Sequence, residues 1–288
     1  MKKTREIPFD NSGDFLNWWF ETQLLKGKAL EVFERYYSNY RKDFSGYLGE
    51  AWTDRHFELD REISRLKDRP NLKILDLGCG TGSVSLYIAG KLRNKCEITG
   101  VDINDDRLLC ARERQRIMEG EIGHRLNCTY RNQNILSLDD KKKYDLVYLE
   151  ETLHHMEPRL AVAKKISELI KDTGFLIVSE ANAYNPLIQL YLFKKRGFRT
   201  IRRKIGKNGK TFLYGDERIM TAKRVAELFE SNGFRVKSLR YFRMASSKLG
   251  KQADRHGFNI IAIEYLICKV PIFRHIFSAH FNIVLMKS

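Results

Sequence analysis

Short apolar runs alternate with helical stretches from residue 72 onward, and this alternation constrains the fold more than any other feature. Five runs have the length and composition of buried strands: 72–77, 97–102, 128–131, 144–149 and 174–180. Segments with helical character lie between them, at 83–92, 105–119 and 158–170. Because strands that alternate with helices usually form a parallel sheet, the pattern predicts a doubly wound α/β fold.

Two kinds of segment flank this core. Residues 14–45 and 54–67 have apolar side chains at recurring helical positions, and they predict an N-terminal helical cap over residues 1–69. Residues 70–288 form the α/β domain, in which a helix at 221–231 and strands at 234–243 and 281–286 follow Glu180. Two long segments without regular rhythm, 182–217 and 244–279, are predicted to be insertions in this domain.

Length and composition narrow the class of protein. A chain of 288 residues with 43% hydrophobic residues suits one large domain with insertions. No apolar run reaches 18 residues, and Met1–Glu6 leads into no apolar segment, so we expect neither a membrane span nor a signal peptide. The five cysteines are odd in number and widely spaced, which favours reduced thiols in a cytoplasmic protein.

The positive charge is concentrated in the last third of the chain. The formal net charge is +16, and residues 181–288 hold 22 Lys and Arg against 6 Asp and Glu. A basic field of this kind favours anionic partners, such as phosphates, an anionic membrane surface or nucleic acid. The alternative is a solvated basic surface that only aids solubility.

A glycine-rich loop follows the first strand and carries the strongest functional signal. Asp76 precedes it, and glycines at 78, 80 and 82 would let a ligand press against bare backbone. The next helix starts at once, so its free N–H groups face the same crevice. Asp102 ends the second strand, where a carboxylate can accept hydrogen bonds from both ribose hydroxyls. A dinucleotide or S-adenosylmethionine would fit, but Ser83 stands where the dinucleotide fingerprint needs glycine.

The stretch from Ile74 to Gly82 resembles the first motif of class I S-adenosylmethionine-dependent methyltransferases, and the resemblance covers residues 70–180 with a helix and strands up to 243. It implies a Rossmann-like, mostly parallel seven-stranded sheet with an antiparallel last strand. It also implies that S-adenosylmethionine is the cofactor and assigns it nine residues. Asp76 would support the loop and the cofactor's amino group, Asp102 would hold the ribose, and Asn134 would accept from the adenine. The remaining expected contacts are Gly78, Cys79, Gly80, Ile103, Ile135 and Glu150.

Tyr144–Val147, followed by Glu150–His155, resembles the same family's fourth motif in the form common among small-molecule methyltransferases. Methyl transfer needs mainly alignment and exclusion of water, but a hydroxyl or acidic-carbon acceptor benefits from a general base. The candidates are Glu151, His154 and His155; for the two histidines, packing and hydrogen bonding at a helix start is the alternative role. No Asn/Asp-Pro-Pro-aromatic motif follows the fourth strand, which argues against an exocyclic amino acceptor, and nothing indicates a catalytic metal.

The two insertions are expected on the substrate side, because ligands bind at the carboxyl ends of parallel strands. Residues 184–214 carry nine basic residues and no acid: Lys194, Lys195, Arg196, Arg199, Arg202, Arg203, Lys204, Lys207 and Lys210. Residues 258–277 are strongly apolar and are broken by Pro271. This basic lid predicts either a surface that touches the membrane or a hydrophobic acceptor with an anionic group. The alternative is a lid that packs its apolar face inward and leaves its basic residues in water.

The sequence therefore predicts a cytoplasmic enzyme, in part peripheral at the membrane, that methylates a small-molecule or lipid-like acceptor. Isoprenoid, quinone-like and lipid-linked molecules are the expected classes. Two alternatives stay open. One is an RNA methyltransferase, although no RNA-binding module or repeated aromatic platform is evident. The other is a non-catalytic protein that binds S-adenosylmethionine.

Overall fold

Seven strands form one sheet in the computed structural model, in the order β3-β2-β1-β4-β5-β9-β8. Their bounds are β1 Leu72–Leu77, β2 Cys96–Asp102, β3 Cys128–Asn132, β4 Tyr144–Glu150, β5 Ile170–Ala181, β8 Phe234–Phe242 and β9 His280–Lys287. β9 runs antiparallel to both β5 and β8, whereas β1, β2 and β3 are mutually parallel and β4 is parallel to β5. The predicted Rossmann-like sheet with an antiparallel last strand is confirmed.

The structure describes residues 9–22, 24–41, 44, 46–138, 142–205, 209, 211–244 and 247–288. The expectation about the first six residues, and Lys207 and Lys210 of the basic segment, lie outside the described residues. The chain divides into two units, Met1–Leu138 and Asp139–Ser288.

Three helices open the first unit: α1 Ser12–Thr22, α2 Gly27–Arg41 and α3 Tyr47–Leu66. The single helix predicted over residues 14–45 was wrong, because the chain leaves helical geometry after Thr22 and restarts at Gly27, whose φ is +53°. The apolar spacing continues across the break, so periodicity alone could not reveal it. α3 also starts earlier than the predicted residue 54.

Apolar faces join these helices to the rest of the first unit. Phe15 and Trp19 of α1 and Phe33 of α2 are almost fully buried, and the ring of Phe15 lies 5.7 Å from that of Tyr87. Tyr87 belongs to α4 (Ser83–Leu92), which follows β1, and α5 (Asp105–Ile122) follows β2. Asn104 caps α5 by accepting a hydrogen bond from the backbone N–H of Arg107 at 3.1 Å.

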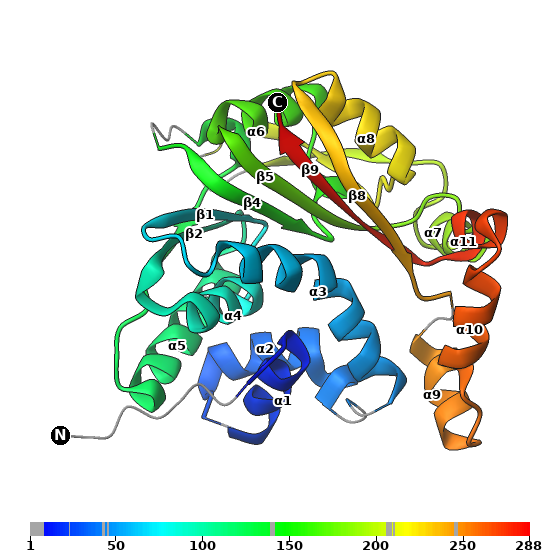
Figure 1. The fold of residues 1–288 in the computed structure, drawn as a ribbon, viewed down its shortest axis with the longest axis horizontal. Coiled ribbons are helices and arrows are strands. Elements are labelled where there is room, and N and C mark those ends of the chain that lie inside the picture. Colours follow the sequence, from blue (N-terminus) through cyan, green and yellow to red (C-terminus); the bar gives the residue numbers. More distant parts are fainter. Residues whose placement is uncertain are drawn as a thin grey trace. The chain divides into compact units, whose positions relative to one another are not determined.

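The second unit builds its core on β5 and β9, which lie side by side (Figure 1). Val178 pairs with Ile283 and Ile177 with Val284, and all four side chains are buried, as expected for strands covered on both faces. Helices α6 (Arg159–Leu169) and α8 (Ala222–Glu230) supply further apolar cover. β5 begins at Ile170, which the sequence had placed at the end of the preceding helix.

The insertion at 182–217 is ordered in its described part, although no regular element was predicted there. It contains α7 (Pro186–Arg196) and a hairpin of β6 (Ile201–Ile205) and β7 (Thr211–Gly215). The Asn185 side chain caps α7 by accepting from the N–H groups of Leu187 and Ile188 at 3.0 and 3.1 Å. The periodic signal was absent because most of these side chains are exposed.

The insertion at 244–279 is helical. It holds α9 (Ser247–Arg255), α10 (Ile260–Cys268) and α11 (Pro271–Phe277). Asn259 caps α10 through the N–H of Ala262 at 3.0 Å, and Pro271 starts α11 because it cannot continue the preceding helix. Within the described ranges, no helix has the length and hydropathy that crossing a membrane requires.

Candidate active site

The glycine-rich loop is held by the backbone and side chain of the neighbouring strand. The N–H groups of Gly78 and Cys79 both donate to the carbonyl of Val101, at 2.7 and 3.1 Å. The N–H of Gly80 donates to Oδ2 of Asp102 at 3.0 Å. Gly78, Gly80 and Gly82 have φ of +76°, +54° and +76°, a region that glycine adopts without strain.

Two glycines of this loop serve different purposes. A Cβ on Gly82 would meet Oη of Tyr130 at 2.8 Å and Cβ of Ala111 at 2.9 Å, so this glycine allows the loop to pack on its own unit. A Cβ on Gly80 would meet no atom closer than 3.9 Å. The space beside Gly80 is therefore open, and it fits a ligand that lies against the backbone.

Asp102 is positioned for the predicted ribose contact but already has partners. Its side chain is buried, Oδ2 accepts from Gly80, and Oδ1 accepts from the N–H of Asn104 at 2.8 Å. A carboxylate has about four acceptor positions, so two remain for ribose hydroxyls. The guanidinium of Arg107 lies 4.0 Å from Oδ2 and partly balances the negative charge.

Asp76 and Cys79 act within the protein itself. Oδ2 of Asp76 accepts from the hydroxyl of Ser85 at 2.6 Å, which ties the end of β1 to α4. The side chain of Cys79 packs in a buried cluster with Leu108, Ala111 and Tyr130. Burial, with the charge of Asp76, raises the pKa of the Cys79 thiol well above its usual range. Only the backbone of Cys79 is thus available to a ligand.

The other predicted cofactor residues differ in availability. Ile103 is 42% exposed beyond the end of β2, as an adenine contact requires. Oδ1 of Asn134 accepts from the N–H of Leu136 at 2.9 Å, which leaves one lone pair for the predicted adenine hydrogen bond. Ile135 is buried, and Glu150 at the end of β4 accepts from the hydroxyl of Tyr148 at 3.1 Å. Their contacts with cofactor stay predictions.

Two residues outside the glycine-rich loop hold it in place, and the sequence analysis did not identify either of them. Oη of Tyr37 in α2 is hydrogen-bonded to the hydroxyls of Thr81 and Ser83, at 3.1 and 2.8 Å. Arg114 of α5 is fully buried and donates through Nη1 to the Thr81 carbonyl at 3.0 Å and the Ser83 hydroxyl at 2.7 Å. No feature of the neighbouring sequence distinguishes Arg114 from a solvent-exposed arginine, so its burial could not be predicted.

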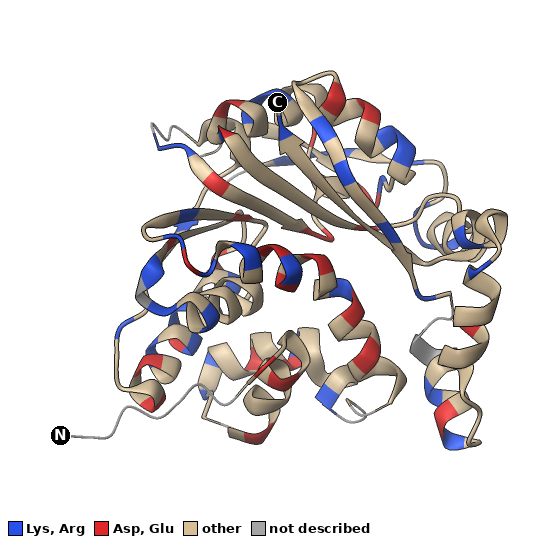
Figure 2. Ribbon diagram, viewed as in Figure 1, with Lys and Arg blue, Asp and Glu red and all other residues tan. Residues whose placement is uncertain are grey.

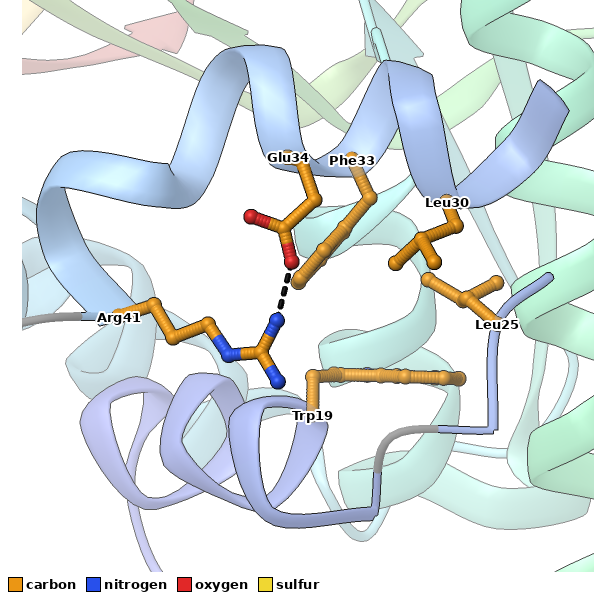
Figure 3. A pocket seen from close by; sticks show the side chains of 6 residues that line it. All are labelled: Trp19, Leu25, Leu30, Phe33, Glu34 and Arg41. Atoms are coloured by element: carbon orange, nitrogen blue, oxygen red, sulfur yellow. Dashed lines mark hydrogen bonds and ion pairs between the residues drawn. The ribbon is translucent and has the colours of Figure 1, made fainter. Parts of the chain in front are cut away.

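Aromatic rings enclose the Arg114 guanidinium. Its Cζ lies 4.5 Å from the ring centroid of Trp19 and 5.1 Å from that of Phe33, distances at which a cation is attracted to a ring face. The same two rings line a pocket of about 220 Å³ between α1 and α2, which Leu25 and Leu30 border and an ion pair of Arg41 with Glu34 flanks (Figure 3). The buried Arg114 therefore contacts both the rings of α1 and α2 and the glycine-rich loop.

The second unit carries a cluster of acidic and imidazole groups at the carboxyl ends of β4 and β5. His154 and Glu180 are both buried, and Nδ1 of His154 lies 2.6 Å from Oε2 of Glu180. The other oxygen of Glu180 accepts from the N–H groups of Thr152 and Leu153 at 2.9 and 2.6 Å. Burying a carboxylate costs free energy unless hydrogen-bond donors and a neighbouring cation compensate it.

His155 completes this chain of hydrogen bonds. Its Nδ1 donates to the carbonyl of Gly215 at 2.8 Å, because a carbonyl can only accept. Its Nε2 therefore holds a lone pair, and it lies 3.1 Å from Nε2 of His154, which must carry the proton between them. The His155 ring also stacks on Tyr214 of β7 at 4.7 Å. The hairpin of the insertion thus forms one wall of the cluster.

The charges of the cluster follow from this arrangement. Burial lowers the pKa of His154, but the carboxylate of Glu180 outweighs it and, with Glu151 and Glu217, raises the pKa to about 9. Burial and the positive charge of His154 lower the pKa of His155, which is neutral near pH 7. Burial would raise the pKa of Glu217, but the hydrogen bond from Lys195 and the charge of His154 lower it.

Two carboxylates beside His154 have unusual backbone geometry. Glu151 and Glu217 have φ of +47° and +52°, values that cost a non-glycine residue energy and are common at functional sites. Oε1 of Glu151 lies 2.9 Å from Nδ1 of His280 at the start of β9. Ligand atoms of His154, His155 and Glu217 lie within 4.8 Å of one another, a spacing that a cation could bridge. The shared proton accounts for the close contact of the two rings, so we assign this cluster to proton chemistry.

The structure therefore brings the three predicted catalytic residues together and adds Glu180 and Gly215. Glu151, His154 and His155 lie in one segment after β4, and Glu180 ends β5. Glu180 could have been noticed as an acid at the carboxyl end of a predicted strand. Gly215 and Tyr214 could not, because they come from an insertion whose hairpin was not predicted.

Comparison with known proteins agrees with this geometry. Residues 68–233 match a family model described as a methyltransferase domain. (S)-coclaurine N-methyltransferase of Papaver somniferum is 30% identical over 146 residues, 49% of this chain and 39% of that protein. A ubiquinone biosynthesis O-methyltransferase of Glaesserella parasuis is 30% identical over 116 residues, 38% of this chain and 45% of that protein. The match therefore spans less than half the length of these curated relatives.

A solved structure shows the same fold. Magnesium protoporphyrin IX methyltransferase of Synechocystis, with bound S-adenosylhomocysteine, has a TM-score of 0.54 at 18% identity, over 89% of this chain and 94% of that one. A second structure of that protein holds S-adenosylmethionine and has a TM-score of 0.52 at 15% identity, over 98% of this chain and 100% of that one. The methyltransferase family predicted from the glycine loop is confirmed. The chain belongs to the methyltransferase domain family.

Proposed function

We propose that the protein transfers the methyl group of S-adenosylmethionine to an oxygen or an acidic carbon of a hydrophobic small molecule. The observation that carries this proposal is the cluster of Glu180, His154 and His155 with Glu151 beside it. It lies at the carboxyl ends of β4 and β5, where ligands bind in parallel sheets. A protein that only bound the cofactor would have no use for a buried acid–base cluster there.

In this proposal the first unit holds the cofactor. Gly78, Cys79 and Gly80 face it with backbone, Asp102 accepts from its ribose, and Asp76 supports the loop and the amino group. Ile103, Asn134 and Ile135 surround the adenine. S-adenosylmethionine supplies an activated methyl group on its sulfur. The open space beside Gly80 and the two spare acceptor positions of Asp102 support this assignment.

The second unit handles the acceptor's proton. The side chain of Glu151 is 29% exposed, so it is accessible to an acceptor. We assign it the proton that leaves the acceptor as the new bond to the methyl carbon forms and the bond from that carbon to sulfur breaks. His154 is too buried to touch an acceptor, so it is a positioning residue. Its positive charge is one of the causes that lower the pKa of the Glu217 carboxyl.

A hydrophobic acceptor is favoured by two observations. The two curated relatives described above are named for coclaurine and for ubiquinone biosynthesis, which supports a small organic acceptor over nucleic acid. The second unit also exposes many apolar side chains on its two insertions. Isoprenoid, quinone-like and lipid-linked molecules are the classes we propose, and RNA is the competing acceptor that the experiment must exclude.

The test uses S-adenosylmethionine labelled on its methyl group. The protein is incubated with lipid, small-molecule and RNA fractions of its host, and the label is followed into each. Label in the lipid or small-molecule fraction, absent with Gly80→Val protein, supports the proposal. Label in RNA alone would replace the acceptor class, and cofactor binding without label in any fraction would favour a binding protein.

A second experiment tests Glu151. Glu151→Gln should lower kcat by about 10²- to 10⁴-fold, the usual contribution of a general base, with the KM for S-adenosylmethionine unchanged. Glu168→Gln, which changes an exposed carboxylate of α6 in the same unit, is the matched control and should behave as wild type. An unchanged kcat in Glu151→Gln would remove Glu151 from the mechanism and leave the cofactor assignment standing.

A further inference from the structure

α10 of the last insertion presents apolar residues outward and its acid inward. Glu264 of α10 is 6% exposed; it accepts from the N–H of Met244 at 2.8 Å and lies 3.6 Å from a guanidinium nitrogen of Arg243. Its neighbours Tyr265 and Leu266 are 67% and 61% exposed. A helix that faced water on its outer side would show the reverse distribution. The exposed apolar side chains of this insertion are Phe258, Ile263, Tyr265, Leu266, Ile267, Val270, Ile272, Phe273 and Phe277.

α7 of the other insertion has an exposed apolar face of its own. Leu187, Leu190 and Tyr191 are 68%, 53% and 62% exposed, and their spacing of three and four residues places them on one side of the helix. Leu192 is the one α7 side chain that is buried. Phe198, just after the helix, is 90% exposed. Such an arrangement is unusual for a helix that only covers a core.

The helices that carry the two exposed faces are joined through α11. The amide of Asn185, at the start of α7, donates to the carbonyl of Phe277 in α11 at 2.6 Å, and the amide of Asn182 donates to the carbonyl of His275 at 2.9 Å. Figure 1 shows α7, α10 and α11 next to one another at the edge of the second unit. We call the exposed apolar residues of these three helices, with Phe198 and Phe258, the apolar surface.

Positive charge surrounds the apolar surface. Lys194 continues the exposed face of α7. Arg274 lies in α11 and Lys269 two residues before that helix, and both are exposed. Figure 2 shows Lys and Arg on α7 and on the chain that follows it. Residues 184–214 contain no acid at all. Lys195 and Arg202 are paired with Glu217 and Asp216, so we base the inference on the exposed Lys194, Lys269 and Arg274.

We infer that the apolar surface docks onto the face of a lipid bilayer that contains anionic lipids. Apolar side chains flanked by lysine and arginine match the acyl boundary and the anionic headgroups together. α10 and α11 have nine and seven residues and are separated at Pro271, so they lie in the plane of the interface and do not cross it.

Other occupants fit less well. A second copy of the chain would bring the same positive charge to the same surface, and the two would repel one another. RNA would be attracted by Lys194 and Arg274 but would gain nothing from the aliphatic side chains of α10. The inference does not depend on methyl transfer, because docking needs neither cofactor nor acceptor.

Vesicle flotation of the full chain, without S-adenosylmethionine, tests this docking. We expect the protein to float with vesicles of phosphatidylcholine and phosphatidylglycerol, and to float about tenfold less with phosphatidylcholine alone. Failure to float with the anionic vesicles overturns the inference. Loss of methyl transfer in the same preparation would leave it intact, so the two proposals fail separately.

Variants locate the contact. The double variants Tyr265→Ser/Leu266→Ser and Leu190→Ser/Tyr191→Ser change exposed side chains and should fold, yet float at least tenfold less than wild type. Leu160→Ser, which changes a 70% exposed leucine on α6, is the apolar control and should float normally. Lys194→Glu should lose binding to anionic vesicles, with Lys164→Glu on α6 as its control. Flotation of the double variants at the wild-type level would refute the inference.

A depth measurement separates a bilayer from other occupants. Tyr265→Trp should be quenched by lipids brominated along the acyl chain, whereas Leu160→Trp should not, relative to the natural tryptophans Trp18, Trp19 and Trp52. Absence of quenching at residue 265 would overturn the inference. So would sedimentation showing a dimer that Tyr265→Ser/Leu266→Ser dissociates, because the surface would then be covered by a second copy.

Discussion

The glycine loop of the first unit and the histidine cluster of the second are built in opposite ways. The loop presents backbone, and its key residues, Gly78 to Gly82 with Asp102, come from one β-α-β stretch. The cluster presents side chains, and its members come from the ends of β4 and β5 and from the hairpin at Gly215. The difference indicates that cofactor binding is encoded locally, while the acceptor side depends on an insertion.

The largest effect is expected at Gly80, because it tests whether the loop is a ligand site at all. Gly80→Val fills the open space beside the backbone and strains a φ of +54°, so cofactor binding should fall below detection by calorimetry. Gly123→Val carries the same kind of strain at a φ of +74°, with no atom near its Cβ, and should leave the affinity unchanged. Normal binding by Gly80→Val would move the cofactor elsewhere.

Gly215→Ala tests whether the acceptor side depends on the hairpin. A Cβ at residue 215 would lie 2.1 Å from the carbonyl oxygen of His154, so the hairpin must move away from the cluster. Because displacement of an active-site group by about 1 Å can cost 10²-fold, kcat should fall by up to about a hundredfold with cofactor affinity intact. Leu213→Ala in the same strand is the control. Equal kcat in both variants would make the hairpin a simple cover.

Asp102→Ala sharpens the cofactor side of the comparison. Loss of charge-assisted hydrogen bonds should weaken S-adenosylmethionine binding by about 1.5–3 kcal/mol, roughly ten- to a hundredfold. Asp106→Ala is the control, because that side chain is 54% exposed and pairs only at 3.4 Å with Lys28. An affinity unchanged in Asp102→Ala, measured by calorimetry, would count against the ribose contact.

A smaller effect is expected from pH on the acceptor side. The pKa of His154 is raised from 6.5 to about 9, so the stabilisation from its pair with Glu180 is fully present below pH 6.5 and is lost as pH rises through about 9. His154→Gln should therefore remove part of the decline in unfolding free energy across that range, as measured by denaturant titration. Parallel curves for the two proteins would show that His154 is not protonated in the folded state.

The same contrast explains what could be predicted from the sequence. The strand segments and the loop with Asp102 could be, because apolar runs and glycine spacing are local signals. Glu151, His154 and His155 were predicted from the resemblance to the fourth motif; the structure brings them together, and their catalytic role stays a prediction. Arg114 and Tyr37 could not be found, since their contacts with Thr81 and Ser83 depend on how helices pack. The elements of both insertions were missed because their apolar residues face outward and leave no core-facing pattern.

The buried Arg114 has one more consequence. It connects Trp19 and Phe33 of the first two helices to the loop at Thr81, so the free energy of folding those helices and the free energy of ligand binding are linked. Linkage is reciprocal: if folding of these helices raises the affinity for the ligand, then bound ligand stabilises the helices against unfolding by the same free energy. Limited proteolysis of residues 9–41 should therefore slow as S-adenosylmethionine saturates the protein. A fragment lacking these residues would keep every motif residue and still bind more weakly.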